Sequence, residues 1–370
     1  MSPRLRKLLP WFGYPLFYVG SFVLFAYLTF PLDRLRDRAI VAFNEDQHKS
    51  GGASQLEIDR IDTYWFSGIE ARGVRLLTPA SVNPDGTKKP ATEIEVERAT
   101  LRVSLLPLLL GRIKFNFHVE LFGGSIDGFT EKGGADRSVD VEFEKLSVAS
   151  ISPLVNTIGL PMAGELGGNA TLTMPEGKLS KASGAVNLTI ADFSVADGKT
   201  KIKDAIALPK MNVGDLTFEC EIADGVMKLT KFAAAGQDLD FSADGKLTLR
   251  DTFAESQADM YLKFRFADKY KNKDDNTRAL FGAPGSNAPA LFEIADPRLK
   301  QSKRPDGFYS WRAWGLLRTL RFDPAPAGGS APRGPSGSGT PTPGGGLRGI
   351  AAPDSPKRPA AEKPATDDTP

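Results

Sequence analysis

The chain changes its hydrophobic pattern near residue 51, where a two-residue alternation begins. The clearest example is "IKFNFHVEL" (Ile113–Leu121), in which apolar and polar residues take turns. A strand with one buried and one solvated face produces this pattern. The same alternation returns in "VDVEFEKLSV", "GAVNLTI", "DLTFECEI" and "MYLKFRF". Half-buried β-sheet is therefore predicted for the middle of the chain.

Glycine-containing pairs divide these strands and predict hairpin turns, because such pairs tolerate the positive φ that two-residue turns need. The pairs are Gly123–Gly124, Asp127–Gly128, Asp224–Gly225, Asp244–Gly245 and Asp306–Gly307. Several begin a loose repeat of glycine and alternating apolar positions, whose spacing is irregular. We therefore expect a mainly β fold with a predominantly antiparallel sheet built from hairpin repeats, rather than a strict solenoid.

The predicted β-rich domain covers residues 51–323, and its internal division is left open. The stretch "LSVASISPLVNTIGLPM" reads as a short helical or irregular insertion, because Pro153 and Pro161 limit a helix there. Glycines at 164, 167 and 168 follow it. A sub-boundary near residue 160 is conceivable on this pattern.

Before the strands, residues 8–30 form an apolar run without a charged residue. As a helix this run would be about 34 Å long, which matches the hydrocarbon thickness of a bilayer. A basic tail over residues 1–7 also suits a signal peptide, but the run is longer than a typical signal core and no small-residue cleavage site follows it. We expect a single uncleaved transmembrane helix. The basic residues on its two sides balance, so charge alone does not orient it.

The segment 31–50 predicts a juxtamembrane amphipathic helix. Leu32, Leu35, Ala39 and Phe43 follow helical spacing between charged residues. Such a helix would lie on the membrane surface or pack against the domain that follows.

Residues 324–370 are rich in proline, glycine and alanine and nearly free of large apolar side chains. Little apolar burial is available there to offset the entropy of ordering. A disordered tail is predicted.

Charge and rare residues exclude several classes of function. The chain has 47 basic and 45 acidic residues, for a net charge of +2, and therefore lacks the basic excess of a nucleic-acid-binding protein. The single cysteine, Cys220, cannot form an intramolecular disulfide and reads as a small core residue. His48 and His118 cannot build a histidine-rich metal site, and His118 reads as an exposed strand residue.

One stretch has the spacing of a calcium loop: "DFSADGKLTLRD" (Asp240–Asp251). A calcium loop prefers a glutamate at its twelfth position and an entering helix, whereas here Asp251 is shorter and Gly236 lies upstream. Apolar residues also alternate on both sides of Asp244–Gly245. We therefore interpret the stretch as a hairpin.

Catalytic motifs are equally incomplete. The "GKT" at Gly198–Thr200 lacks the first glycine of a phosphate-binding loop, and "GGSIDG" lacks the closing glycine of a nucleophile elbow. No catalytic, cofactor-binding or metal-binding residues are predicted, and the chain is not expected to be an enzyme.

A family resemblance is carried by the order of five segments and the preceding apolar run. The segments are "YWFSGIEARGVRLLTP", "VSLLPLLLGRIKFNFHVELFGGSIDG", "LPMAGELGGNATLTMPEGKLSKASGAVNLT", "GDLTFECEIADGVMKLTKFAAAGQDLDFSADGKLTLRD" and "DGFYSWRAWGLLRTLRFDP". In this order they resemble type II secretion system protein N in its deltaproteobacterial form, over roughly residues 10–325. The leucine-rich "SLLPLLLG" followed by sheet is similar to AsmA-like proteins.

The first resemblance implies a single-pass inner-membrane protein with a cytoplasmic N-terminus and a periplasmic β domain. Its expected role is that of an accessory component of the type II protein secretion machinery, which docks other components through sheet surface or unpaired edge strands. The AsmA-like resemblance implies an alternative, in which lipid is bound or transferred along an apolar β groove.

Overall fold

The computed structural model describes residues 14–15, 17–22, 24–25, 29, 31–49, 53–82, 88–152, 160–202, 206–282, 290–295 and 297–325. About half of the predicted transmembrane segment 8–30 and nearly all of the predicted tail lie outside these residues. Among the described residues, no helix combines the length and the apolar character needed to cross a membrane.

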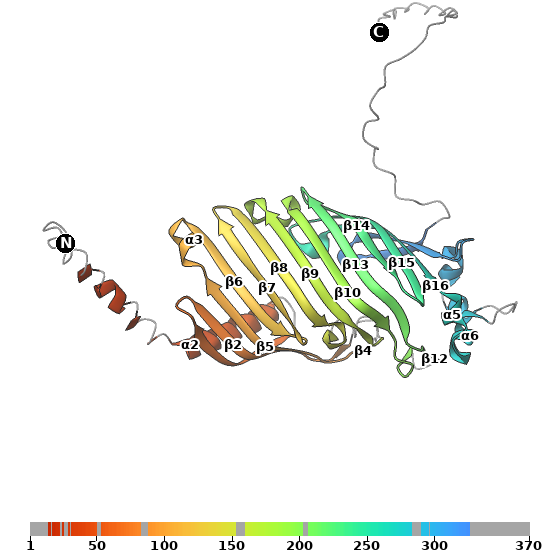
Figure 1. Cartoon of the computed structure of the whole chain (residues 1–370), viewed down its shortest axis with the longest axis horizontal. Helices are drawn as coiled ribbons and strands as arrows, with labels where there is room; N and C mark the ends of the chain where they lie inside the picture. The colour runs from red at the N-terminus through yellow and green to blue at the C-terminus, as the bar shows by residue number, and fades with distance from the viewer. Residues whose placement is uncertain are drawn as a thin grey trace, which may run out of the picture. The chain divides into compact units, whose positions relative to one another are not determined.

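One antiparallel sheet of fourteen strands dominates the described part of the chain (Figure 1). Its strands, in spatial order, are β1 (Gln55–Tyr64), β2 (Gly68–Thr78), β5 (Thr92–Val103), β6 (Arg112–Leu121), β7 (Gly124–Gly133), β8 (Asp136–Ser147), β9 (Met162–Met174), β10 (Ser183–Val195), β13 (Met211–Ala223), β14 (Val226–Ala235), β15 (Leu239–Thr248), β16 (Gln257–Phe266), β17 (Tyr309–Leu316) and β18 (Arg321–Pro324). Spatial order follows sequence order throughout, so the sheet is an up-and-down meander. The predictions of a mainly β fold and of an antiparallel sheet are confirmed.

Short elements occupy the connections and the margins of the sheet. Two small hairpins are β3 (Ser81–Val82) with β4 (Lys88–Lys89), and β11 (Lys201–Ile202) with β12 (Ile206–Ala207). The helices are α2 (Leu32–Lys49), α3 (Leu105–Leu109), α5 (Asp268–Lys271), α6 (Asp275–Phe281), α7 (Leu291–Ala295) and α8 (Pro297–Ser302). Single 3₁₀ turns are η1 (Val148–Ser150), η2 (Pro175–Gly177), η3 (Leu179–Lys181), η4 (Phe253–Glu255) and η5 (Leu317–Thr319).

The sheet continues across residue 160. β8 and β9 pair from Arg137 with Met174 to Ser147 with Glu165, on either side of the undescribed residues 153–159. The fourteen strands therefore belong to one sheet rather than to two packed sheets.

Two of the predicted hairpin turns are wrong. Asp127–Gly128 lies inside β7, and Asp244–Gly245 lies inside β15. Their glycines allow the backbone of the neighbouring strand to come close. A Cβ on Gly128 would lie 2.3 Å from the carbonyl oxygen of Asp140, and a Cβ on Gly245 would lie 2.4 Å from the carbonyl oxygen of Asp259. Glycine in a strand often marks such a close approach of another backbone.

The other glycine pairs do mark turns, at Gly123–Gly124 between β6 and β7, at Asp224–Gly225 between β13 and β14, and at Asp306–Gly307 before β17. The last strand also reaches further than predicted. Pro324 ends β18 instead of starting the tail, and Ala325 donates its N–H to the carbonyl of Ser310.

Helix α2 packs against the first strand of the sheet. Asn44 Oδ1 accepts a hydrogen bond from the N–H of Leu56 at 2.9 Å, and Arg36 donates to the carbonyl of Asp59 at 3.3 Å. The predicted amphipathic helix is present, but its half-buried side includes Ile40 and leaves Leu35 and Ala39 exposed. Of the two arrangements expected for it, the structure shows packing on the domain.

Two clusters of buried apolar side chains lie on the second half of the sheet. The first consists of Ala182, Cys220, Ile222, Leu247, Leu249 and Ala258, and the second of Met211, Val213, Ala234 and Tyr270. Cys220 is therefore a core residue, as predicted, and burial raises the pKa of its thiol. On β13, the first cluster lies toward the C-terminal end and the second toward the N-terminal end.

Candidate functional site

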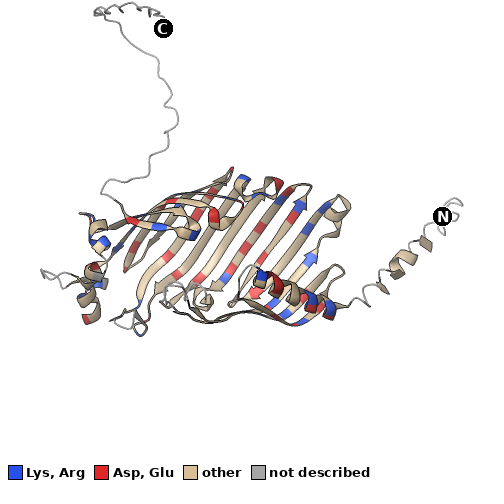
Figure 2. Cartoon of the chain, turned by 180° about the vertical axis from the view of Figure 1, so that it is seen from behind, with Lys and Arg blue, Asp and Glu red and all other residues tan. Residues whose placement is uncertain are grey.

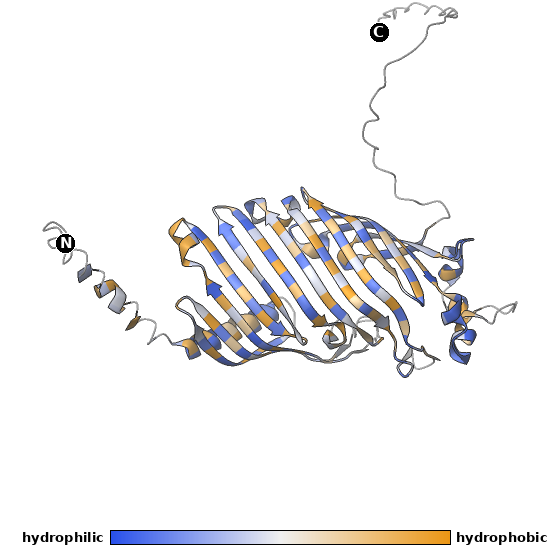
Figure 3. Cartoon of the chain, in the orientation of Figure 1, coloured by the Kyte–Doolittle hydropathy of each residue, from blue (hydrophilic) through white to orange (hydrophobic). Residues whose placement is uncertain are grey.

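A single line of apolar side chains crosses the whole sheet. Strand register places the following residues directly opposite one another, one from each strand: Ile61, Ala71, Ala99, Val119, Ile126, Phe143, Gly168, Leu188, Phe218, Phe232, Ala243, Leu262, Trp311 and Pro324. We call this set the apolar row. Figure 3 shows the alternation of apolar and polar residues along the strands from which the row arises.

The apolar row is only half-covered. Ala243 is buried, and the other members are half-buried. The described helices lie at the margins, since α2 packs on β1 and α8 on β17 and β18 (Figure 1). Phe218 and Phe232 contact each other edge to face, with ring centroids 5.3 Å apart. The row is therefore an ordered apolar strip that retains partial access to solvent.

Charged residues of both signs are distributed over the strands of the sheet and along α2, as the colours of Figure 2 show. Seven polar residues from β2, β5, β6 and β7 form one connected network: Glu70, Arg72, Arg98, His118, Glu120, Ser125 and Asp127. We call this set the polar network. Cross-strand pairs of opposite charge are the sheet equivalent of helical ion pairs and favour the observed register.

Glu70 is the buried anion of the polar network. Its Oε1 accepts hydrogen bonds from Arg72 at 2.6 Å and from Arg98 at 3.0 Å. The bond from Arg72 lowers the pKa of the Glu70 carboxyl, burial opposes this shift, and Arg98 adds to the lowering. Two guanidinium groups thus compensate the burial of one carboxylate.

His118 lies between two carboxylates. Its Nδ1 is 2.6 Å from Asp127 Oδ1 and its Nε2 is 3.3 Å from Glu120 Oε1. The hydrogen bond with Asp127 raises the pKa of His118, burial lowers it, and Glu120 raises it further. The sequence analysis interpreted His118 as an exposed strand residue, whereas the structure shows a half-buried residue with two carboxylate partners.

Ser125, His118 and Asp127 do not form a hydrolytic triad. Ser125 Oγ donates to Asp127 Oδ2 at 3.2 Å, so the hydroxyl contacts the acid rather than the imidazole. The second imidazole nitrogen contacts Glu120. In a triad, the hydroxyl nucleophile is hydrogen-bonded to one imidazole nitrogen, and the carboxylate is hydrogen-bonded to the other. Here Ser125 has no contact with the imidazole, and both imidazole nitrogens contact carboxylates.

The stretch Asp240–Asp251 is not folded as an ion-binding loop. Asp240 Oδ2 accepts a 2.6 Å bond from Arg265, whereas Asp251 Oδ1 accepts bonds from the N–H and Oγ of Ser180. Asp240 lies near the start of β15 and Asp251 lies three residues after its end, and each has a partner of its own. Within the described residues, no group of three histidine, cysteine or acidic side chains is placed to hold a metal ion.

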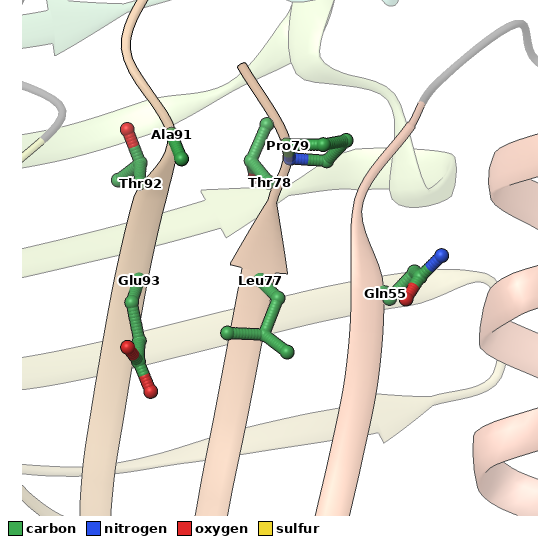
Figure 4. Close-up of a pocket in the computed structure, with 7 residues that line it drawn as sticks. All are labelled: Gln55, Leu77, Thr78, Pro79, Ala91, Thr92 and Glu93. Carbon is green, nitrogen blue, oxygen red and sulfur yellow. The ribbon is translucent and has the colours of Figure 1, made fainter.

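A shallow hollow of about 300 Å³ lies at the ends of β1, β2 and β5. Figure 4 shows Leu77 on the middle strand, with Gln55 and Glu93 on the strands to either side. Thr78, Pro79, Ala91 and Thr92 complete its lining. Glu93 is the one ionisable side chain of this lining, so the hollow offers no paired acid and base.

No protein-family model matches the chain, and neither a curated protein nor a solved structure matches it.

Sequence reasoning identified the strands but missed both multi-strand features. The apolar row and the polar network exist only once the register of each strand pair is fixed. The alternation of apolar and polar residues within each strand was the sequence signal that could have indicated the apolar row and the polar network. Misplaced turns at Asp127–Gly128 and Asp244–Gly245 hid the register, because each divided one strand into two.

Proposed function

We propose that this chain is a non-enzymatic accessory component of a type II protein secretion machinery, held in the inner membrane by residues 8–30 with its sheet in the periplasm. The order of the five resembling segments supports this proposal. In the structure these segments contribute successive strands of one continuous sheet. A continuous sheet of this kind gives other components one rigid surface on which to dock.

The link between the proposed anchor and the sheet is α2. This helix begins at Leu32, directly after the predicted span, and its Arg36 and Asn44 bind the backbone of β1. An anchor at residues 8–30 would therefore hold the sheet close to the membrane instead of at the end of a flexible linker.

Docking is better served by the charged face of the sheet than by its edges. At β1, α2 already satisfies the N–H of Leu56 and the carbonyl of Asp59. At the other edge, β18 has four residues and ends at Pro324. A covered edge and a short edge with proline both disfavour addition of a foreign strand. Exposed polar residues of the strands, such as Glu142, remain accessible to a partner.

Deletion of the gene tests the secretion proposal. We expect the deletion to reduce the amount of folded exoprotein outside the cell, and the full chain to restore it. A chain whose residues 1–30 are replaced by a cleaved signal peptide is the control for anchoring, and it should restore secretion poorly. Unchanged export of folded exoproteins in the deletion strain would contradict the proposal.

The apolar row favours a second candidate function, which is the binding of lipid acyl chains. An acyl chain needs a long apolar surface without charged interruptions, and the row provides one apolar or glycine position on each of fourteen strands. Extended apolar surface that is only half-covered commonly marks a binding site. This candidate corresponds to the AsmA-like resemblance.

Two neighbouring residues of β8 separate the two candidates. Phe143 belongs to the apolar row, whereas Glu142 is exposed and alternates with it. We propose to place a photoreactive benzophenone amino acid at each position of the full chain in native membranes. Protein adducts at position 142 support docking, and lipid adducts at position 143 support lipid binding. Lipid adducts of equal yield at both positions would contradict the second candidate.

A further inference from the structure

We infer that two neighbouring loops of the sheet form a second membrane contact, which inserts apolar side chains into the surface of an anionic phospholipid bilayer. The loops are the β1–β2 turn and the β5–β6 connection that contains α3. Their exposed apolar side chains are Trp65, Phe66, Leu105, Leu106, Leu108, Leu109 and Leu110. We call this set the apolar patch. The inference rests on the proposed anchor at residues 8–30.

The exposure of these side chains is unusual for a soluble surface. Leu109 and Phe66 are each 83% exposed, and Leu106 is 72% exposed. Single exposed apolar residues are common, but a contiguous set of large ones marks an interaction site. Figure 3 shows α3 as an apolar element at one end of the sheet.

Hydrogen bonds hold the two loops together. Val103 donates its N–H to the carbonyl of Ser67 at 3.0 Å, and Ser67 Oγ donates to the carbonyl of Val103 at 2.7 Å. On the other side, Asn116 donates to Ser104 Oγ at 2.7 Å. These bonds hold the backbones of the two loops next to each other, so both loops present their apolar side chains at the same end of the sheet.

The charge around the patch suits an anionic lipid. A hollow of about 470 Å³ joins the two loops, and its charged lining residues are Arg102 and Lys114, with no acid among them. Arg102 also lies over the ring of Trp65, 5.8 Å from its centroid. Aromatic, leucine and basic side chains together are the composition that binds the interface of a bilayer.

The direction of α2 places the proposed anchor at the same end of the sheet. Asn44, near the C-terminal end of α2, contacts Leu56 near the start of β1, whereas Arg36, near the N-terminal end of α2, contacts Asp59 further along β1. Helix α2 and strand β1 therefore run in opposite directions, and Arg36 lies nearer to the β1–β2 turn than Asn44 does. The N-terminal end of α2 therefore points toward the apolar patch. A membrane-spanning segment just before α2 would bring the patch toward the same bilayer surface, which favours lipid over a protein partner.

Site-specific labels on the full chain test this inference. Cys220 is buried and is first replaced by Cys220→Ala, so that Leu106→Cys and Leu109→Cys can each carry one fluorescent label. Phe253→Cys is the matched control, because Phe253 is an apolar residue that is 57% exposed on the β15–β16 connection. Each labelled chain is reconstituted into phosphatidylethanolamine–phosphatidylglycerol vesicles that contain a doxyl-labelled phospholipid.

We expect blue-shifted emission and strong doxyl quenching at positions 106 and 109, and weaker quenching at position 253. Replacing phosphatidylglycerol by phosphatidylcholine should reduce the quenching at 106 and 109. Quenching at both positions that is no stronger than at 253 would overturn the inference. Shielding from aqueous iodide in native membranes without doxyl quenching in vesicles would also overturn it, because it would show a protein partner.

Flotation of the same vesicles separates this inference from the proposed anchor. A chain that floats with the vesicles but has water-exposed labels at 106 and 109 contradicts the second contact alone. A chain that does not float contradicts the anchor, and the inference fails with it.

Discussion

Substitution of Gly168 by alanine should destabilise the sheet, while the same substitution at the neighbouring Gly167 should not. Gly168 is the β9 member of the apolar row and has φ +137°. A Cβ at this position would lie 2.1 Å from the carbonyl oxygen of Asn187 and 2.8 Å from the Cα of Leu188. Both atoms belong to the backbone of β10 and cannot turn away.

The expected magnitude follows from these contacts. A residue with a side chain in such a backbone conformation costs about 1–3 kcal/mol, and displacement of a paired strand adds to this cost. We therefore expect Gly168→Ala to lower the free energy of unfolding by about 3 kcal/mol, and the melting temperature by about 6–12 °C for a sheet of this size.

Gly167→Ala is the matched control. A Cβ at Gly167 would meet its nearest neighbour, the carbonyl oxygen of Phe143, at 3.5 Å, which is an ordinary contact. Alanine reduces the conformational entropy of the unfolded chain relative to glycine. Gly167→Ala should therefore leave the free energy of unfolding unchanged or raise it by about 0.4–1 kcal/mol.

Thermal unfolding of the full chain in detergent, followed by the circular dichroism of the sheet, measures both variants. Equal melting temperatures for Gly167→Ala and Gly168→Ala would refute the reasoning. That result would mean that Gly168 does not lie against the backbone of Asn187 and Leu188, so that the described pairing of β9 with β10 is wrong.

Three further predictions follow from single contacts. Folding raises the pKa of His118, so the stabilisation from its protonated form is fully present below the ordinary pKa of 6.5 and is lost as the pH rises through the pKa of the folded state. His118→Gln should therefore flatten the dependence of the melting temperature on pH above 6.5. An unchanged slope would count against the bond to Asp127. Tyr270 is buried and donates to the carbonyl of Pro209 at 2.9 Å, so Tyr270→Phe should lower stability by about 1 kcal/mol. Burial raises the pKa of Tyr270 to about 12, so Tyr270→Phe should remove the absorbance change of one tyrosine that ionises at this high pH. If the variant instead lacked a tyrosine that ionises near the ordinary pKa, this prediction would be contradicted. Asp251 binds Ser180, so calcium should leave the melting temperature unchanged and Asp251→Asn should lower it; a saturable rise with calcium at micromolar concentration would contradict this assignment.

Local pattern predicted the regular elements of this fold well. The alternation in Ile113–Leu121 became β6, although both faces of that strand are half-buried, and the helical spacing after residue 31 became α2. The period of apolar and polar side chains is a property of the local sequence, so a single chain is enough to detect it.

Glycine was the main source of error. A turn and a close strand contact both require glycine, and the sequence around Asp127–Gly128 or Asp244–Gly245 does not distinguish them. Gly128 lies against Phe117 and Asp140, which come from the two neighbouring strands. Only the paired structure shows this contact.

The candidate surfaces depend even more on pairing. The partners of His118 come from its own strand and from β7, and the apolar row takes one residue from every strand. A shift of one residue in any pair would move a row member to the opposite face. The strands could therefore be predicted from the sequence, whereas the row and the polar network could not.

Disulfide trapping across β8 and β9 tests most directly whether the fourteen strands form one sheet in this register. Val141 pairs with Ala170 on either side of the undescribed residues 153–159. In a Cys220→Ala background, oxidation should join the Val141→Cys and Ala170→Cys pair, because directly opposed residues of antiparallel strands lie within disulfide reach. The Val141→Cys and Thr171→Cys pair, shifted by one residue, should join much less. Equal or preferred joining of the shifted pair would contradict the register and with it the apolar row.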